Sequence, residues 1–318
     1  MATYSLVIPV YNRPDEVDEL LESLTAQTYT DFEVVIVEDG SKIPCKDIVD
    51  KYEEKLSVRY FNIENRGPGG ARNYGVQYST GEYVVILDSD CIIPPSYLEN
   101  VTKAFGETNA DAYGGADKAH STFSTIQKAI NYSMTSFFTT GGIRGSKKKL
   151  DKFYPRSFNL GIKREVYIAL GGFSNMRYGE DIDFSIRIFE GGYKCCYFDE
   201  AWVYHKRRTS FAQFFRQVNH SGHARIDLYL KYPTSLKVVH CLPALFTLGL
   251  AFVLLSSVFC LYALTLPIFY MMIIFIHSLI LNKNLSVALL SIPASFIQLT
   301  AYGIGFLSSV WQKLICKK

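Results

Sequence analysis

Four aspartates stand where their carboxylates could do chemistry, namely Asp39, Asp88, Asp90 and Asp181. Asp39 and the Asp88-Ser89-Asp90 triplet each follow an apolar run that predicts a β-strand. Carboxylates can hold a divalent cation, and such a cation neutralises the negative charge of phosphate groups. A polar turn after a buried strand would also contain Asp and Ser, so the triplet taken alone is open to both interpretations.

The elements that must position these residues alternate between apolar strands and helical segments, a pattern that predicts an α/β sheet with mainly parallel strands. Four strands are expected, at residues 4–10, 32–37, 58–62 and 82–87. Ligands of open α/β sheets bind beyond the carboxyl ends of the strands. Tyr11, Asp39 and Asp88 all fall at such ends, so we expect them at one site.

Five motifs occur in an order and spacing that resemble the family 2 glycosyltransferases with a GT-A fold, over roughly Ser5 to Arg208. They are the segments Val7–Asn12, Val35–Ser41, Asn65–Asn73, Leu87–Asp90 and Gly179–Asp181. Each motif alone is weak, but five in sequence are strong evidence. One departure is visible, because this chain has Glu38 and Asp39 where the family usually has two aspartates.

The resemblance implies a nucleotide-sugar donor, a UDP- or GDP-sugar, and a divalent cation, Mg²⁺ or Mn²⁺. Asp90 is the first expected metal ligand, with Asp88 reaching the metal through water or contacting the ribose hydroxyls. Asp39 would accept hydrogen bonds from a base N–H, while Tyr11, in the motif that contains Pro9, would pack against the ring. Helix capping is the alternative role of Asp39.

The segment from Asn65 to Asn73 holds three glycines and two arginines before a helix expected to begin near Ala71. Glycines let a backbone approach a phosphate closely, and Arg66 and Arg72 can meet its charge. A glycine-rich turn without a ligand would look similar.

Asp181 is the candidate general base, since an inverting transfer needs a carboxylate to take the proton of the attacking hydroxyl. Glu180 or Asp183 could fill that role instead. Acidic residues also favour the first turn of a helix electrostatically, which is the alternative explanation for all three.

His205 ends another apolar strand, and in many related enzymes a histidine at this point completes the metal shell. A lone histidine is commonly structural, so both interpretations stay open. The basic residues that follow, Arg207 and Arg208 with Lys206, could assist the diphosphate or form a solvated turn near a membrane surface.

The segment from Ser210 to Leu230 predicts a helix with aromatic residues beside cations, which suits a membrane interface. Gln217 and Arg225 loosely resemble the Gln/Arg element of membrane-bound relatives. Their spacing departs from the processive pattern, which puts polymer synthesis in doubt. Residues 139–156 are expected to form a loop over the acceptor side, although an idle surface loop would have the same composition.

The charge distribution divides the chain in two. The first 233 residues carry 28 basic and 30 acidic side chains and show no nucleic-acid signature, whereas the five charged residues after Thr234 are all lysines. Seven cysteines without a CxxC pair are interpreted as reduced thiols. The start of the chain lacks the pattern of a signal peptide, so we expect the catalytic part to face the cytosol at the cytoplasmic membrane.

Three hydrophobic segments follow, at about 241–262, 264–282 and 285–310. The first two are long enough to cross a hydrocarbon core, and two crossings return Lys283 to the cytoplasm. The third contains Pro293 and Gln298, and could cross once, bend back or lie in the interface.

The expected organisation is a GT-A domain at 1–208, with a nucleotide-binding half at about 1–115 and an acceptor half at about 116–208. An interfacial helix follows at 209–233 and a membrane domain at 234–318. The expected function is an inverting, metal-dependent transfer of a sugar to a hydroxyl of a lipid-linked glycan, with a role in cell-surface polysaccharide biosynthesis. The alternatives are a polyprenyl-phosphate sugar synthase and a non-catalytic membrane-tethered scaffold. The sugar, the acceptor, the linkage and the oligomeric state are not readable from these motifs.

Overall fold

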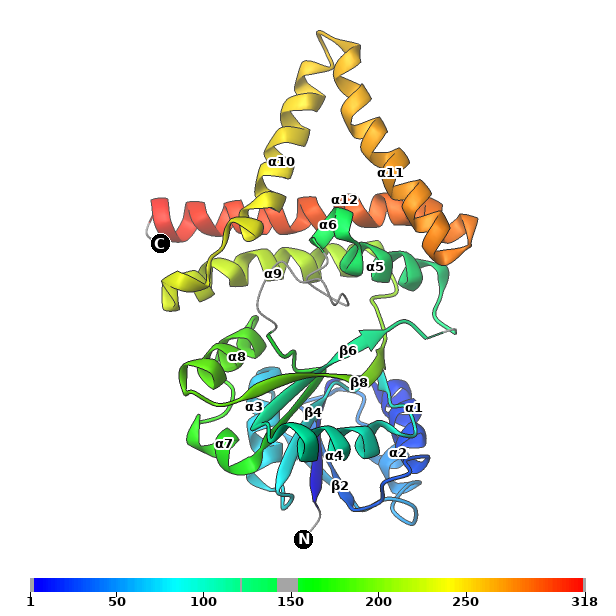
Figure 1. Cartoon of the computed structure of the whole chain (residues 1–318), viewed down its shortest axis with the longest axis vertical. Helices are drawn as coiled ribbons and strands as arrows, with labels where there is room; N and C mark the ends of the chain where they lie inside the picture. The colour runs from blue at the N-terminus through cyan, green and yellow to red at the C-terminus, as the bar shows by residue number, and fades with distance from the viewer. Residues whose placement is uncertain (1–2, 121, 142–153, 317–318) are drawn as a thin grey trace. The chain divides into compact units, whose positions relative to one another are not determined.

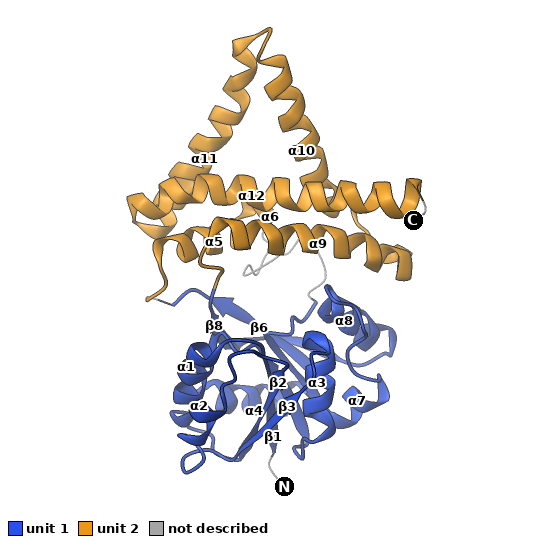
Figure 2. Cartoon of the chain, turned by 180° about the vertical axis from the view of Figure 1, so that it is seen from behind, with its two compact units in different colours: residues 1–120, 153–206 blue, residues 121–152, 207–318 orange. Residues whose placement is uncertain are grey.

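The computed structural model describes residues 3–120, 122–141 and 154–316 of the chain. These residues form two compact units (Figure 2). Unit 1 consists of residues 1–120 and 153–206, and unit 2 of residues 121–152 and 207–318. Unit 1 ends at Lys206, and the described residues 122–141 group with the C-terminal helices in unit 2.

Unit 1 contains one eight-stranded mixed sheet with the strand order β3-β2-β1-β4-β7-β6-β8-β5. The strands β1 to β4 are parallel and β7 runs against them. They are β1 (Tyr4–Val10), β2 (Phe32–Asp39), β3 (Val58–Ile63), β4 (Tyr83–Leu87), β5 (Cys91–Ile92), β6 (Ala112–Lys118), β7 (Asn159–Lys163) and β8 (Cys195–His205). The four expected strands are therefore confirmed as β1 to β4.

Helices cover both faces of this sheet (Figure 1). One apolar core contains residues of α1 (Pro14–Thr25), α2 (Lys46–Asp50) and α4 (Tyr97–Thr108). The other contains residues of α3 (Gly67–Gln77), α7 (Arg164–Ala169) and α8 (Glu180–Glu190). Because β1, β2 and β4 are buried on both faces, they are almost continuously apolar, as expected for central parallel strands.

Helix α3 begins at Gly67, four residues earlier than expected. The glycine-rich segment is therefore the first turn of the helix and not a loop before it. Pro68 stands at the start, where its missing N–H costs nothing. Further along, Gly75 packs directly on the sheet, because a Cβ there would lie 2.5 Å from Cγ1 of Val7.

Unit 2 is helical. Its helices are α5 (Thr125–Thr135), α6 (Phe137–Thr140), α9 (Phe211–Lys231), α10 (Val238–Ser256), α11 (Thr265–Asn282) and α12 (Leu285–Val310). Helix α9 agrees with the helix expected at 210–230, and Ser210 caps it by accepting a hydrogen bond from the backbone N–H of Gln213. Of the loop expected at 139–156, residues 142–153 lie outside the described residues.

Among the described residues of unit 2, three helical segments are long and apolar enough to cross a membrane. They are Val238–Ser256, Leu261–Asn282 and Leu285–Ile315. Their mean hydropathies are 2.3, 2.2 and 1.6, so the third is the least apolar.

Candidate active site

The parallel direction of β1, β2 and β4 brings their carboxyl ends to one edge of the sheet. Tyr11 follows β1, Asp39 ends β2 and Asp88 follows β4. The Tyr11 side chain is half exposed, and Pro9 within β1 is partly buried. A ring at this edge is thus available to pack against a flat ligand.

Asp39 is held in place by the segment that leads into α3. Its Oδ1 accepts a hydrogen bond of 2.6 Å from the backbone N–H of Arg66, and its carbonyl accepts one of 2.8 Å from Asn65 Nδ2. Arg66 itself is exposed, with its guanidinium 5.8 Å from the ring centre of Tyr74. The contact links the end of β2 to the start of α3.

The departure at Glu38 has a structural explanation. Glu38 is fully buried and accepts hydrogen bonds from the Ser41 hydroxyl, from the backbone N–H of Cys45 at 2.8 Å and from the Tyr60 hydroxyl at 3.2 Å. It therefore shapes the loop after β2. The longer side chain reaches these donors, while Asp39 stays at the strand end.

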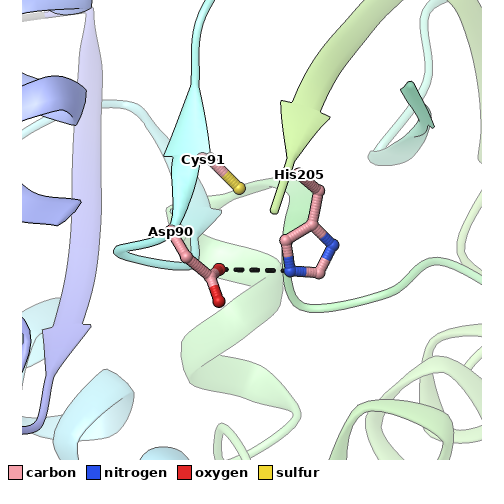
Figure 3. A group of neighbouring side chains, drawn as sticks. All are labelled: Asp90, Cys91 and His205. Atoms are coloured by element: carbon pink, nitrogen blue, oxygen red, sulfur yellow. Dashed lines mark ion pairs between the residues drawn. The ribbon is translucent and has the colours of Figure 1, made fainter. Parts of the chain in front are cut away.

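Asp90 and His205 meet because β5 and β8 pair in antiparallel register, with Cys91 opposite His205. Nε2 of His205 lies 3.1 Å from Oδ1 of Asp90 (Figure 3). The same atom lies 4.0 Å from Oδ2 of Asp88. Phe158 stacks on the imidazole, with ring centres 4.7 Å apart. Asp88 and Asp90 therefore form one cluster with Phe158 and His205, which are distant from them in the sequence.

Two further charged residues, which the sequence did not single out, complete this cluster. Arg13, directly after the β1 motif, forms an ion pair with Oδ2 of Asp90. Asp117, near the end of β6, lies 3.8 Å from Nδ1 of His205. Burial opposes ionisation of Asp90, but His205 and Arg13 outweigh it and hold the pKa of Asp90 well below its usual range. Asp90 is thus a carboxylate at neutral pH.

The donor set fits a hard divalent cation. Carboxylate oxygens suit Mg²⁺ or Mn²⁺, and imidazole is a common metal ligand. Oδ1 of Asp90 is a buried atom that faces His205 at 3.1 Å. Cys91 Sγ lies in the same group of neighbouring donor atoms. Burial raises the pKa of Cys91 well above its usual range, so it stays a thiol and is the least suited of the three to such a cation.

Arg72 connects the segment after β4 with the start of helix α8. Its guanidinium donates to Oδ1 of Asp88 and to Oε1 of Glu180, both at 2.8 Å, and lies 5.1 Å from the ring centre of Phe173. The side chain is nearly fully buried. Glycines at the start of α3 make this possible, since a Cβ at Gly69 would come 3.3 Å from Cβ of Phe173.

The three acids that begin α8 have different surroundings. Glu180 is bound to Arg72, and burial, with Asp181 as the second cause, raises the pKa of Glu180. Asp183 is fully buried and pairs with Arg187 at 2.9 Å. Asp181 is partly exposed, with Oδ2 3.3 Å from Arg156. Arg156 is the last residue of the loop expected at 139–156, and no motif of the sequence assigned it a role of its own.

The four residues expected on the acceptor or membrane side all belong to unit 2. Arg207 is buried and donates to Oδ1 of Asn131 at 3.0 and 3.2 Å. Arg208, Gln217 and Arg225 are partly buried, the last two on α9. Arg207 therefore has a structural contact within unit 2.

Comparisons with known proteins find similarity to glycosyltransferases. The sequence profile of the family described as "Glycosyl transferase family 2" matches residues 5–171. Glycosyltransferase AglE of Haloferax volcanii is 26% identical over 247 residues, which cover 75% of this chain and 78% of AglE. An uncharacterized glycosyltransferase of Rickettsia bellii is 36% identical over 108 residues, which cover 34% of this chain but only 16% of that protein.

The poly(ribitol-phosphate) beta-N-acetylglucosaminyltransferase TarS of Staphylococcus aureus is 36% identical over 115 residues, or 35% of this chain and 20% of TarS. Among solved structures, mannosyltransferase PcManGT from Pyrobaculum calidifontis, in complex with GDP-Man and Mn²⁺, has a TM-score of 0.67 at 18% identity. That match covers 97% of this chain and 87% of PcManGT.

The mixed sheet with helices on both faces has the α/β architecture of the GT-A glycosyltransferases. The chain belongs to glycosyl transferase family 2. The family, the fold class and the enzyme class expected from the sequence are therefore confirmed.

Proposed function

We propose that this chain is an inverting, metal-dependent glycosyltransferase. It transfers a sugar from a UDP- or GDP-sugar to a hydroxyl of a lipid-linked glycan at the cytoplasmic face of the membrane. The observation that carries the proposal is the cluster of Asp88, Asp90 and His205, connected through Arg72 to the acids that begin α8.

A nucleotide donor is supported by the strand-end residues. Asp39 has a fixed carboxylate for a base N–H, and Tyr11 offers an exposed ring beside it. Two structurally similar proteins bind nucleotide sugars, since TarS has been solved in complex with UDP-GlcNAc and PcManGT in complex with GDP-Man. Arg66, exposed at the start of α3, is available to the diphosphate.

The residues that would hold a divalent cation are Asp90, Asp88 and His205. When bound, the cation supplies positive charge next to the diphosphate leaving group. Arg13 gives Asp90 a counter-charge within the chain, and Arg72 does the same for Asp88. Each arginine therefore holds its carboxylate in place through an ion pair.

Asp181 is the proposed general base. Of the three acids that begin α8, it is the one whose carboxylate is neither fully buried nor bound to a buried arginine. It would accept the proton of the acceptor hydroxyl as that oxygen attacks the sugar. Glu180 and Asp183 then have supporting roles, since Glu180 orients Arg72 and Asp183 orients Arg187.

The membrane setting rests on the three apolar helical segments of unit 2. An acceptor carried on a lipid would meet the enzyme at the surface of the bilayer. A role in building cell-surface polysaccharide is consistent with such an acceptor.

The test uses the purified full chain in detergent with a panel of UDP- and GDP-sugars and a lipid-linked glycan extract. We expect nucleotide release with one donor, abolished by EDTA and restored by Mn²⁺ or Mg²⁺. Release that is insensitive to EDTA would contradict the metal-dependent mechanism. No release and no thermal stabilisation by any nucleotide would favour the non-catalytic scaffold instead.

A second candidate is a polyprenyl-phosphate sugar synthase, and Arg156 is the observation that favours it. Its guanidinium lies 3.3 Å from Asp181, where a cation could also bind an acceptor phosphate. A phosphate acceptor needs no general base. The two candidates therefore differ in their response to loss of Asp181.

A further inference from the structure

Helix α12 is long and apolar enough to cross a membrane, yet within unit 2 it lies side by side with α9 (Figures 1 and 2). The two helices contact each other over most of their length. A helix that crosses a bilayer has its two ends on opposite sides of the membrane. If both ends of α12 contact a helix that lies at the membrane surface, α12 cannot cross.

The first half of α12 contacts α5 and α9. Val287 and Ala294 form an apolar cluster with Ala129 of α5, and Phe211 of α9 packs against the same cluster. Further along, Ala301 is buried with Phe214 of α9. These contacts hold the N-terminal half of α12 beside two helices of unit 2.

The middle of α12 approaches α9 at backbone distance. A Cβ at Gly305 would lie 2.1 Å from the carbonyl oxygen of Asn219, and a Cβ at Gly222 would lie 2.3 Å from that of Tyr302. Asn219 Nδ2 also donates to the carbonyl of Ala301 at 3.1 Å. Glycines on both helices are therefore required for this close packing.

The C-terminal end of α12 is held as well. Ser309 Oγ donates to the carbonyl of His223 at 3.5 Å, and Lys313, just past the helix end, pairs with Asp227 of α9. Contacts between the two helices therefore continue from Phe211 to Asp227 along α9.

Helix α9 cannot lie in hydrocarbon. Its polar residues include exposed Arg216 and Lys231 and partly exposed Arg225 and Asp227. Charged side chains are costly in a bilayer core, whereas they are favourable where headgroups meet acyl chains. Because α12 is attached to α9 at both ends, it shares this location.

The α10–α11 hairpin has the opposite character. It contains no Asp, Glu, Lys or Arg between Val238 and Asn282. Its tip is apolar and fully accessible, with Phe259 93% and Tyr262 83% exposed. Backbone groups of the tip bond to one another, as in the 2.9 Å bond from Cys260 N–H to the Ser256 carbonyl. An apolar, internally hydrogen-bonded tip is suited to lipid.

We infer that α12 does not cross the membrane. It lies in the interface beside α9, and the α10–α11 hairpin is the part of unit 2 that enters the bilayer. The end of the chain then returns to the side on which α9 lies. Lys237, Lys283 and Lys313 are all on that one side, which agrees with the preference of lysines for the cytoplasmic face.

The native cysteines allow a direct test of this topology, independent of catalytic activity. Cys316 is exposed after α12, Cys260 is exposed at the hairpin tip, and Cys195 and Cys196 in unit 1 are partly exposed. A membrane-impermeant maleimide is applied to sealed inside-out and right-side-out vesicles that contain the full chain. Mass spectrometry of the cysteine peptides then reports which thiols are labelled.

We expect Cys316 to react in the same vesicle orientation as Cys195 and Cys196, and Cys260 not to react in that orientation. Reaction of Cys316 only in the opposite orientation would show that α12 crosses and would overturn the inference. Reaction of Cys260 together with Cys316 would show that the hairpin does not enter the bilayer, which would also overturn it.

Charge reversal tests the contact at the end of α12 separately. Lys313→Asp and Asp227→Lys each place like charges together, and each should lower the melting temperature in detergent. The double variant should recover most of that loss if Lys313 and Asp227 are on the same side. Absence of any recovery would contradict the pairing.

Discussion

Nε2 of His205 lies 3.1 Å from Oδ1 of Asp90, although the two residues are 115 positions apart in the sequence. The short pairing of β5 with β8 creates this contact, because it sets Cys91 opposite His205. The backbone N–H of Lys206 also donates to the Asp90 carbonyl at 3.0 Å. The position of the candidate metal ligands is thus fixed by backbone pairing as well as by charge.

Asp90→Asn removes the charge from the carboxylate nearest to His205. We expect kcat/KM for nucleotide release to fall by about 100-fold or more, since a group that stabilises developing charge contributes on that order. The Mn²⁺ concentration required for half-maximal activity should also rise. Asp50→Asn, a surface acid paired with Lys46, is the matched control and should leave both quantities unchanged.

Asp181→Asn separates the two candidate reactions. Transfer to a hydroxyl should lose about 10²- to 10⁴-fold in kcat, the usual contribution of a general base, with KM for the donor nearly unchanged. Transfer to a polyprenyl phosphate should survive. Wild-type rates with a hydroxyl acceptor would rule out Asp181 as the base.

Asp183→Ala tests whether the third acid of α8 is structural. Asp183 is fully buried, and its loss leaves Arg187 without its carboxylate, which costs about 3 kcal/mol for a buried pair. The thermal midpoint should therefore fall. A variant that melts like the wild type but has no activity would show that Asp183 takes part in catalysis instead.

The pH dependence of stability should have a contribution from Glu33. Burial opposes its ionisation, but hydrogen bonds from Ser5 and Thr80 and the charge of Arg59 outweigh burial and hold the pKa of Glu33 below its ordinary value of 4.5. A lowered folded-state pKa gives stability that is complete above pH 4.5 and is lost as the pH falls through the folded-state value.

Glu33→Gln should thus lower the melting temperature at pH 7, by an amount equivalent to about 2 kcal/mol for hydrogen bonds to a charged group. The difference from wild type should shrink as the pH falls below 4.5. Melting curves between pH 3 and pH 7 measure both quantities. A difference that stays constant over that range would show that ionisation of Glu33 does not contribute.

The ends of β2 and β4 could be predicted because the apolar runs stop at Asp39 and Asp88, which leaves few other positions for the end of each strand. The order of the motifs then identified Asp90, Asp181 and His205 as candidates. Arg13 and Asp117 carried no comparable signal, since their partners come from β5 and β8, and pairing between distant strands has no local pattern. The early start of α3 was missed because glycine has low helix propensity, which packing against the sheet overrides here.

The behaviour of α12 was also beyond the sequence. Its length and hydropathy match those of a spanning helix, and most of its buried residues are small ones whose role depends on a partner surface. The need for a glycine at position 305 becomes clear only from the carbonyl oxygen of Asn219, which would lie 2.1 Å from a Cβ there. The composition therefore indicated that the segment is apolar, whereas the contacts with α9 determine where the helix lies.

The bridge made by Arg72 has a consequence for engineering and for evolution. Its two carboxylate partners are Asp88, which follows β4, and Glu180, which begins α8. These two residues are 92 positions apart in the sequence. In a chimera that takes α8 from a homologue with another acceptor, Arg72 would not match its new partner in α8 unless position 72 is exchanged as well. Recombination among such enzymes should accordingly preserve these three positions as a co-inherited set.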